Sequence, residues 1–145
     1  MLRNGTWLVP TLLAPQGVLD AADAGVTFPP GVLEKATAVI EIHRAAVRRA
    51  AEAGVRIAMG TDSGITPHGR NLRELALMAG VGMPPAAVLE ATTRSSARLL
   101  GVDDELGTIE PGKAADLVAV SGDPYDLDTL PERIDGVWLT GRRVA

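Results

Sequence analysis

Short apolar runs and long loops alternate with helical periodicity in the first part of the chain. The run Trp7-Leu8-Val9 ends at Pro10, and proline cannot donate to the ladder of a central strand. We therefore expect a short buried strand that ends near Thr11. Val55 to Met59 predicts a second buried strand. Residues 14–31 hold three glycines, three prolines and little periodicity, which predicts a long loop of the kind that forms lids or binding loops.

The spacing of apolar residues predicts one helix between these two strands and another after them. One helix is predicted from about Val32 to Ala53, before Gly54, because apolar or amphipathic side chains recur there at alternating spacings of four and three. Those residues are Ala36, Ile40, His43, Val47 and Ala50. A short helix should begin after Asn71, with Glu74 completing a capping-box spacing.

The sequence pattern changes from helical periodicity to short apolar runs at the end of a further helix. That helix is predicted from Pro84-Pro85 to about Leu100, with Gly101 as its stop. Beyond it, glycines and prolines punctuate short apolar runs, which is typical of small strands. The expected strands are Ala115–Val120, Val137–Leu139 and Arg143-Val144, with Thr140-Gly141 as a hairpin turn between the last two.

This element order predicts an α/β fold with two parts. Residues 1–101 form two successive β/α units, and residues 102–145 form a separate β-rich unit. Because a closed (β/α)₈ barrel requires about eight strands, two strands amount to roughly a quarter of one. The chain is therefore expected to be a fragment with open sheet edges and exposed apolar faces, which favour association.

Composition narrows the functional classes. The net charge of −4 is spread over short mixed groups, which argues against a nucleic-acid surface. No apolar run approaches the ~20 residues of a membrane span. The absence of cysteine excludes disulfides and thiolate metal sites and fits a reducing, cytoplasmic location.

Asp62 is the leading candidate for chemistry. It follows the apolar run Val55–Met59, and active sites of α/β proteins form at the C-terminal ends of strands. Its carboxylate is expected to point into the cleft at the ends of the strands, where Thr61 and Ser63 would orient it. There it would act as a metal ligand, a general base or both. The alternative is that Asp62 caps the turn that follows it.

Motifs along nearly the whole chain carry a family resemblance. They are Trp7-Leu8-Val9-Pro10-Thr11-Leu12; Gly60-Thr61-Asp62-Ser63-Gly64 with His68-Gly69, Asn71 and Glu74-Leu75; Ala91-Thr92 with Ala97 and Leu100-Gly101; Gly107-Thr108-Ile109-Glu110-Pro111-Gly112-Lys113 with Ala115-Asp116-Leu117-Val118; and Val137 with Gly141 and Val144. Together they resemble the C-terminal part of the amidohydrolase superfamily, in the branch of imidazolonepropionases and prolidase-like dipeptidases.

The resemblance implies a fold, a cofactor and a reaction. The fold would be the last two β/α units of a metal-dependent hydrolase TIM barrel with part of a small β-sandwich. Asp62 would bind one divalent metal, zinc by expectation, in a site of one or two ions. It would also take a proton from the activated water and pass it to the leaving nitrogen. Substrates would be cyclic amides, N-acyl compounds or dipeptides.

The departures from that family predict an incomplete site. The family also uses a His-x-His pair, usually a carboxylated lysine, and two further histidines, whereas this sequence has only His43 and His68. One carboxylate cannot hold zinc tightly, so we expect the chain alone to be inactive. The alternatives are a non-catalytic split subunit that packs against a partner carrying the missing strands, or a standalone binding module.

Two further residues are candidates for substrate contact. His68 lies in a polar loop close to the expected substrate position, and a local hydrogen bond is an equally good interpretation of it. Thr11 follows the first strand and could line the pocket or simply pack in its wall. His43 lies on the inner stripe of a helix and is interpreted as a border residue rather than a ligand.

Overall fold

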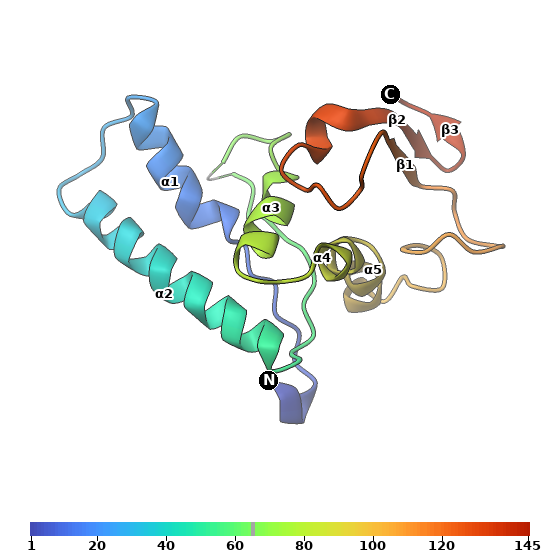
Figure 1. Cartoon of the computed structure of the whole chain (residues 1–145), viewed down its shortest axis with the longest axis horizontal. Coiled ribbons are helices and arrows are strands. Elements are labelled where there is room, and N and C mark those ends of the chain that lie inside the picture. Colours follow the sequence, from blue (N-terminus) through green and yellow to red (C-terminus); the bar gives the residue numbers. More distant parts are fainter. Residues whose placement is uncertain (65) are drawn as a thin grey trace.

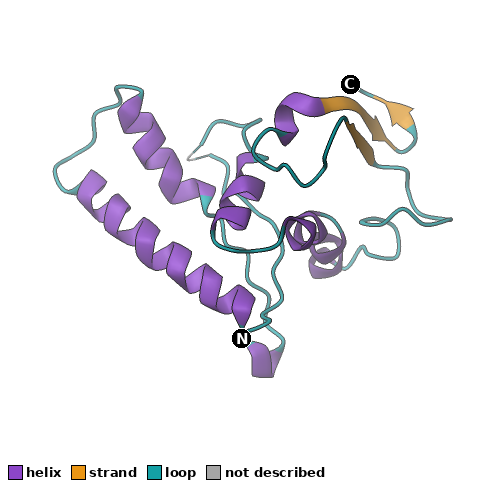
Figure 2. Ribbon diagram, in the orientation of Figure 1, coloured by secondary structure: helices purple, strands orange, loops and turns teal. Residues whose placement is uncertain are grey.

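A computed structural model describes residues 1–64 and 66–145. Figure 1 shows α1 and α2 side by side at one side of the molecule and the small sheet at the other, and Figure 2 separates helices from strands. The helices are the 3₁₀ turn Leu2–Asn4, α1 (Leu13–Asp23), α2 (Val32–Glu52), α3 (Arg73–Gly80), α4 (Pro85–Thr92), α5 (Arg94–Leu100) and the 3₁₀ turn Leu130–Arg133. The strands are β1 (Leu117–Val120), β2 (Ile134–Leu139) and β3 (Arg142–Arg143). None of these helices is both long and apolar enough to cross a membrane.

The two apolar runs expected as strands lie beside each other, but they pair at one point only. Leu8 and Ile57 form a single parallel bridge. The backbone N–H of Leu8 donates to the Arg56 carbonyl over 2.9 Å, and that of Ala58 donates to the Leu8 carbonyl over 3.0 Å. Parallel strands are stable in larger sheets with both faces covered, and no third strand flanks this pair among the described residues. The expected strands are therefore reduced to one bridge.

The interpretation of residues 14–31 as a long loop is wrong, because α1 occupies their first half. Pro15 falls in the first turn of α1, where a missing N–H costs nothing. Gly17 is buried because α1 approaches Thr66 so closely that any side chain at position 17 would collide with it. Pro15 and Gly17 are residues typical of loops, but neither of them interrupts this helix. In contrast, α2 matches its predicted span closely.

The helix predicted from residue 84 to 100 is divided into α4 and α5 at Thr93, where φ is −114° and ψ is −88°. The hydroxyls of Thr92 and Thr93 donate to the carbonyls of Val88 and Leu89, one turn back. Such bonds compete with the helical ladder and bend helices. Gly101 ends α5 in the left-handed conformation, as predicted.

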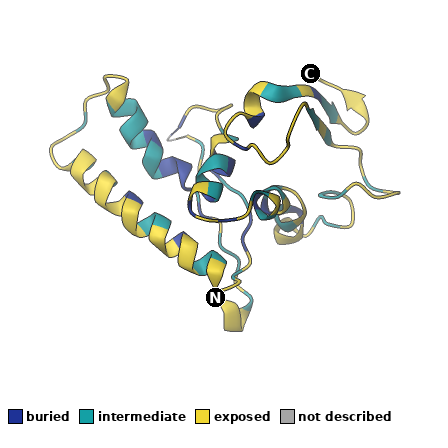
Figure 3. Cartoon of the chain, in the orientation of Figure 1, coloured by how far each residue is buried: buried dark blue, intermediate teal, exposed yellow. Residues whose placement is uncertain are grey.

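One apolar cluster holds the described chain together. It includes Val47 of α2, Ile57 of the bridge, Met78 of α3 and Val88 of α4. Leu127 and Leu130 from the C-terminal segment belong to the same cluster. Figure 3 shows this arrangement as buried segments at the centre, while the outer face of α2 is largely exposed. The β-rich segment therefore packs on the helices, and a domain division at residue 101 stays a prediction.

The C-terminal strands form an antiparallel sheet in the order β1-β2-β3. Leu117 pairs with Trp138, and Trp138 pairs with Arg143 on its other side. Thr140 and Gly141 have φ of 49° and 79°, the positive values that a tight hairpin turn needs at both central positions. The predicted hairpin is confirmed.

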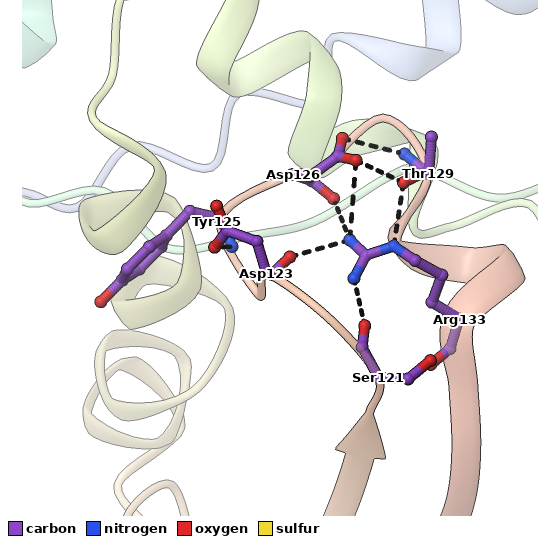
Figure 4. Close-up of polar contacts among 6 residues, drawn as sticks. All are labelled: Ser121, Asp123, Tyr125, Asp126, Thr129 and Arg133. Atoms are coloured by element: carbon purple, nitrogen blue, oxygen red, sulfur yellow. Dashed lines mark hydrogen bonds and ion pairs between the residues drawn. The ribbon is translucent and has the colours of Figure 1, made fainter.

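Arg133 fastens the loop between β1 and β2 (Figure 4). Its guanidinium donates to the carbonyls of Ser121, Asp123 and Asp126, and to the Thr129 hydroxyl over 2.9 Å. The Thr129 hydroxyl in turn bonds to the Asp126 carboxylate, and this bond lowers the pKa of Asp126. One side chain thereby satisfies three backbone carbonyls and one hydroxyl of this connection.

Glu74 joins two segments that are far apart in the sequence. It is fully buried in α3, and its two carboxylate oxygens accept the backbone N–H groups of Leu12 and Leu13 over 2.8 and 2.7 Å. These amides begin α1, where N–H groups have no partner within the helix. The capping-box interpretation of Glu74 is therefore wrong: its carboxylate caps α1 instead of its own helix. Burial raises the pKa of Glu74 to about 7, although the two backbone bonds act to lower it.

This pKa makes stability depend on pH. The pKa of Glu74 is raised from 4.5 to about 7, so the folded chain holds a proton that the unfolded chain has released in that interval. The contribution of Glu74 to stability is fully present below pH 4.5 and is lost as the pH rises through about 7. The full shift corresponds to roughly 3 kcal/mol.

We expect the free energy of unfolding to fall between pH 5 and pH 7.5, as measured by urea denaturation at a series of pH values. In Glu74→Gln most of that slope should disappear, because glutamine does not titrate. Glu90→Gln, at an exposed position of α4, is the matched control and should keep the slope. An identical pH dependence in wild type and Glu74→Gln would contradict this assignment.

Candidate functional site

The site lies where the two apolar runs end. Because Leu8 and Ile57 pair in parallel, both runs end at the same edge, and Thr11 and Asp62 follow them. The runs are closely packed there: a Cβ on Gly60 would collide with the Val9 side chain and stand 3.9 Å from Cγ2 of Thr11. The sequence places glycine at 60 because this close approach leaves no room for a side chain.

Thr11 and Asp62 share an unusual backbone conformation. Their φ values are 49° and 50°, and together with Thr140 they are the only non-glycine residues with positive φ among those the structure describes. For an L-residue this conformation costs about 1–2 kcal/mol, and it is least favourable for a β-branched one such as threonine. Strain of this kind persists where surrounding structure enforces it, and it concentrates at functional sites. At Thr11 the neighbouring Glu74 bonds supply that enforcement.

Asp62 itself is exposed, between a buried and a half-buried neighbour. The hydroxyls of Thr61 and Ser63, which we expected to orient it, hydrogen-bond to each other over 2.8 Å. No hydrogen bond between described residues reaches the Asp62 carboxylate, whether from these hydroxyls or from a turn that it would cap. Asp62 is thus presented on a left-handed turn whose flanking hydroxyls are already paired.

The described residues do not form a metal centre on their own. No group of three or more His, Asp or Glu side chains lies close enough to hold an ion within residues 1–64 and 66–145. His68 is exposed on the loop after Asp62, and His43 is half-buried on α2. A zinc site needs about three protein ligands, and the described residues bring no two further His, Asp or Glu side chains close to Asp62.

Sequence reasoning missed the residues that fix the surroundings of the site. Glu74 is one of them, and its only sequence signal is that it shares a helical face with the apolar Met78 four residues on. Asp20 is another: it accepts hydrogen bonds from Arg73 and from Gln16, which itself accepts one from Arg44. Burial acts to raise the pKa of Asp20, but the bonds from Arg73 and Gln16 and the charges of Arg73 and Arg70 hold it below its usual value. A polar chain thereby links α2, α1 and α3.

Comparison with known proteins agrees with this architecture. The chain matches the amidohydrolase family over residues 1–144. It is 37% identical to an imidazolonepropionase from Geobacillus kaustophilus over 109 residues, which cover 71% of this chain and 24% of that protein. It is 39% identical to a 5-methylthioadenosine/S-adenosylhomocysteine deaminase from Desulforudis audaxviator over 84 residues, 51% of this chain and 20% of the relative.

The fold is similar to a solved Xaa-Pro dipeptidase with methionine bound in its active site. The TM-score is 0.88 and the sequence identity 39%, over 99% of this chain and 36% of the dipeptidase. The chain thus spans about a third or less of the length of these relatives. Since the family match extends over nearly every residue, the chain belongs to the amidohydrolase family.

Proposed function

We propose that this chain supplies the C-terminal part of a metal-dependent hydrolase of carbon–nitrogen bonds, with Asp62 as its catalytic carboxylate. In this proposal residues 1–101 form the last two β/α units of a (β/α)₈ barrel, and residues 102–145 form part of a small β-sandwich. The observation that carries the proposal is the placement of Asp62 at the shared end of two parallel runs, in a left-handed turn.

The position of Asp62 suits a group that acts on substrate. In β/α barrels, catalytic residues come from the ends of several strands at one face, and Asp62 and Thr11 both follow such ends. The exposure of Asp62 here fits a side chain whose partners lie on other strands of the barrel. The match to family members along 99% of the chain supports the same placement of these strands.

The missing ligands define what Asp62 would do. It would contribute one ligand to a divalent ion, zinc by expectation, that is held mainly by strands outside this chain. The ion supplies Lewis acidity and lowers the pKa of water. The carboxylate of Asp62 would accept a proton from the attacking water and deliver it to the leaving nitrogen. Thr11 and His68, on the two loops at this edge, would contact the substrate.

The substrate class follows from the chemistry of the relatives. A deaminase, an imidazolonepropionase and a dipeptidase all act on carbon–nitrogen bonds in small molecules. We propose cyclic amides, N-acyl compounds or dipeptides as substrates. The alternative function is that of a non-catalytic subunit packing against a partner that carries the other strands. Exposed apolar side chains support it: Val9 at the strand end is 39% exposed, and Val118 and Leu139 of the sheet are 57% and 54% exposed.

A chimeric enzyme tests the catalytic role of Asp62. This chain would replace the matching C-terminal third of the Xaa-Pro dipeptidase, whose remaining strands would supply the other metal ligands. We expect metal-dependent cleavage of Xaa-Pro dipeptides, and a loss of about 10²–10⁴-fold in kcat on Asp62→Asn, as for removal of a general base. Asp104→Asn, at an exposed position after α5, should leave activity unchanged.

Two results of the chimera experiment would overturn the proposal. One is a folded, metal-loaded chimera that cleaves no dipeptide. The other is a chimera whose activity survives Asp62→Asn. The first result would favour the non-catalytic packing subunit.

Zinc content tests whether the chain alone holds metal. Because it offers one carboxylate, we expect the purified chain to retain far less than one zinc ion per molecule by elemental analysis after dialysis, and to show no amidase activity. Near-stoichiometric zinc that is lost in Asp62→Asn would contradict this expectation.

Self-association of the purified chain tests whether its exposed apolar faces and strand edges drive contacts between molecules. We expect the purified chain to self-associate, as measured by size-exclusion chromatography with light scattering, because no described residue covers the strand edges or the exposed apolar side chains named above. Charged substitutions at Val118 and Leu139 should reduce the apparent mass. A monodisperse monomer with a cooperative melt would count against both the open edges and the packing-subunit alternative.

A further inference from the structure

A hollow of about 280 Å³ separates α1 from the loop that follows Asp62. Its α1 side carries the apolar Leu13, Ala21 and Ala24 together with the carboxylate of Asp20, and Val26 continues that wall beyond the helix. Its other side carries Thr66, Pro67, Arg70 and Arg73. Pockets for drug-sized ligands begin at roughly 300 Å³, so this hollow suits a smaller molecule.

The charges around the hollow do not cancel. Asp20 contributes one negative charge, and Arg73 is hydrogen-bonded and ion-paired to it. Arg70 lines the same hollow, and none of the ion pairs between described residues uses its guanidinium. The positive charge of Arg70 acts on the groups that line the hollow, because it helps to lower the pKa of Asp20. The hollow is therefore left with one positive charge in excess.

A buried hydroxyl provides a second, independent feature. Thr66 lines the hollow with only 5% of its surface exposed, and its Oγ1 has no hydrogen-bond partner among the described residues. An unsatisfied buried hydroxyl costs about 1–3 kcal/mol, so such groups usually serve a ligand or water. Its methyl group packs against Gly17, which sets the close approach of α1 to the loop.

We propose that this hollow binds a small monocarboxylate that carries a short apolar group. Arg70 pairs with the carboxylate, for which the planar guanidinium offers two parallel donors. In this proposal the Thr66 hydroxyl, which has no partner among the described residues, donates to the same anion. The apolar wall of Leu13, Ala21 and Val26 covers the remainder of the ligand.

The position of the hollow connects it to the reaction. Its two walls, α1 and the loop 66–70, begin just after the strand ends that carry Thr11 and Asp62. A dipeptide or an N-acyl amino acid carries a carboxylate close to the amide bond that is cut. We therefore assign the hollow as the subsite for the substrate carboxylate, an assignment that rests on the proposed function. Binding of the carboxylate itself does not depend on it.

Ligand-observed saturation-transfer NMR on the purified, metal-free chain tests the site and tolerates self-association. The probe is N-acetyl-L-valine, and the matched neutral ligand is N-acetyl-L-valinamide. We expect saturable binding of the acid, at least fivefold weaker for Arg70→Gln and at least fivefold weaker for the amide. Arg49→Gln, at an exposed position of α2, removes an equal charge elsewhere and should bind as wild type does.

A further variant separates the site from general attraction to positive charge. Ala21→Leu narrows the hollow and keeps the charge, so it should also weaken binding severalfold. Equal binding of acid and amide, or unchanged binding in both Arg70→Gln and Ala21→Leu, would overturn the proposal. Because the assay needs neither metal nor turnover, failure here leaves the chimera result intact. Likewise, an inactive chimera with normal acid binding would reject the function alone.

Discussion

The bonds from Glu74 to the start of α1 are the constraint on which the arrangement of the candidate site depends. Parallel pairing between the two apolar runs is limited to Leu8 and Ile57, which is too little to fix the loops that follow. Glu74 supplies the missing link, because one buried carboxylate takes two successive amides from a segment 61 and 62 residues away. Truncating it would leave two buried N–H groups without partners.

The same constraint explains why strained turns persist at this edge. Thr11 keeps its positive φ directly before the two amides that Glu74 holds, so the turn cannot relax without breaking those bonds. The second run is fixed differently: the Met59 N–H donates to the carbonyl of Ala91, at the end of α4. Asp62 therefore follows a run anchored by α4, and Thr11 lies in a turn anchored by α3.

Local patterns predicted α2 and the C-terminal hairpin but missed α1, and they predicted the long-range contacts poorly. The span of α2 follows from periodicity, and the turn at Thr140-Gly141 follows from the backbone freedom of Gly141; a single segment determines each of them. Asp62, which we propose as the catalytic carboxylate, was chosen for its place after an apolar run. Glu74 was mistaken for a helix-start residue because its partners are far away in sequence. Gly17 marks close packing on Thr66 and not a loop, and the sequence alone does not distinguish the two.

One short segment directs its polar side chains toward α1. Arg70 faces the hollow beside this helix, Arg73 pairs with Asp20 on it, and Glu74 caps its first turn. The segment from Arg70 to Glu74 is therefore positioned against α1 by charged side chains. Since α1 follows directly from the turn at Thr11, a change of side chains along α1 would alter the rim of the site while leaving Asp62 in place. Relatives with different substrates could diverge at this helix without disturbing the carboxylate to which we assign the chemistry.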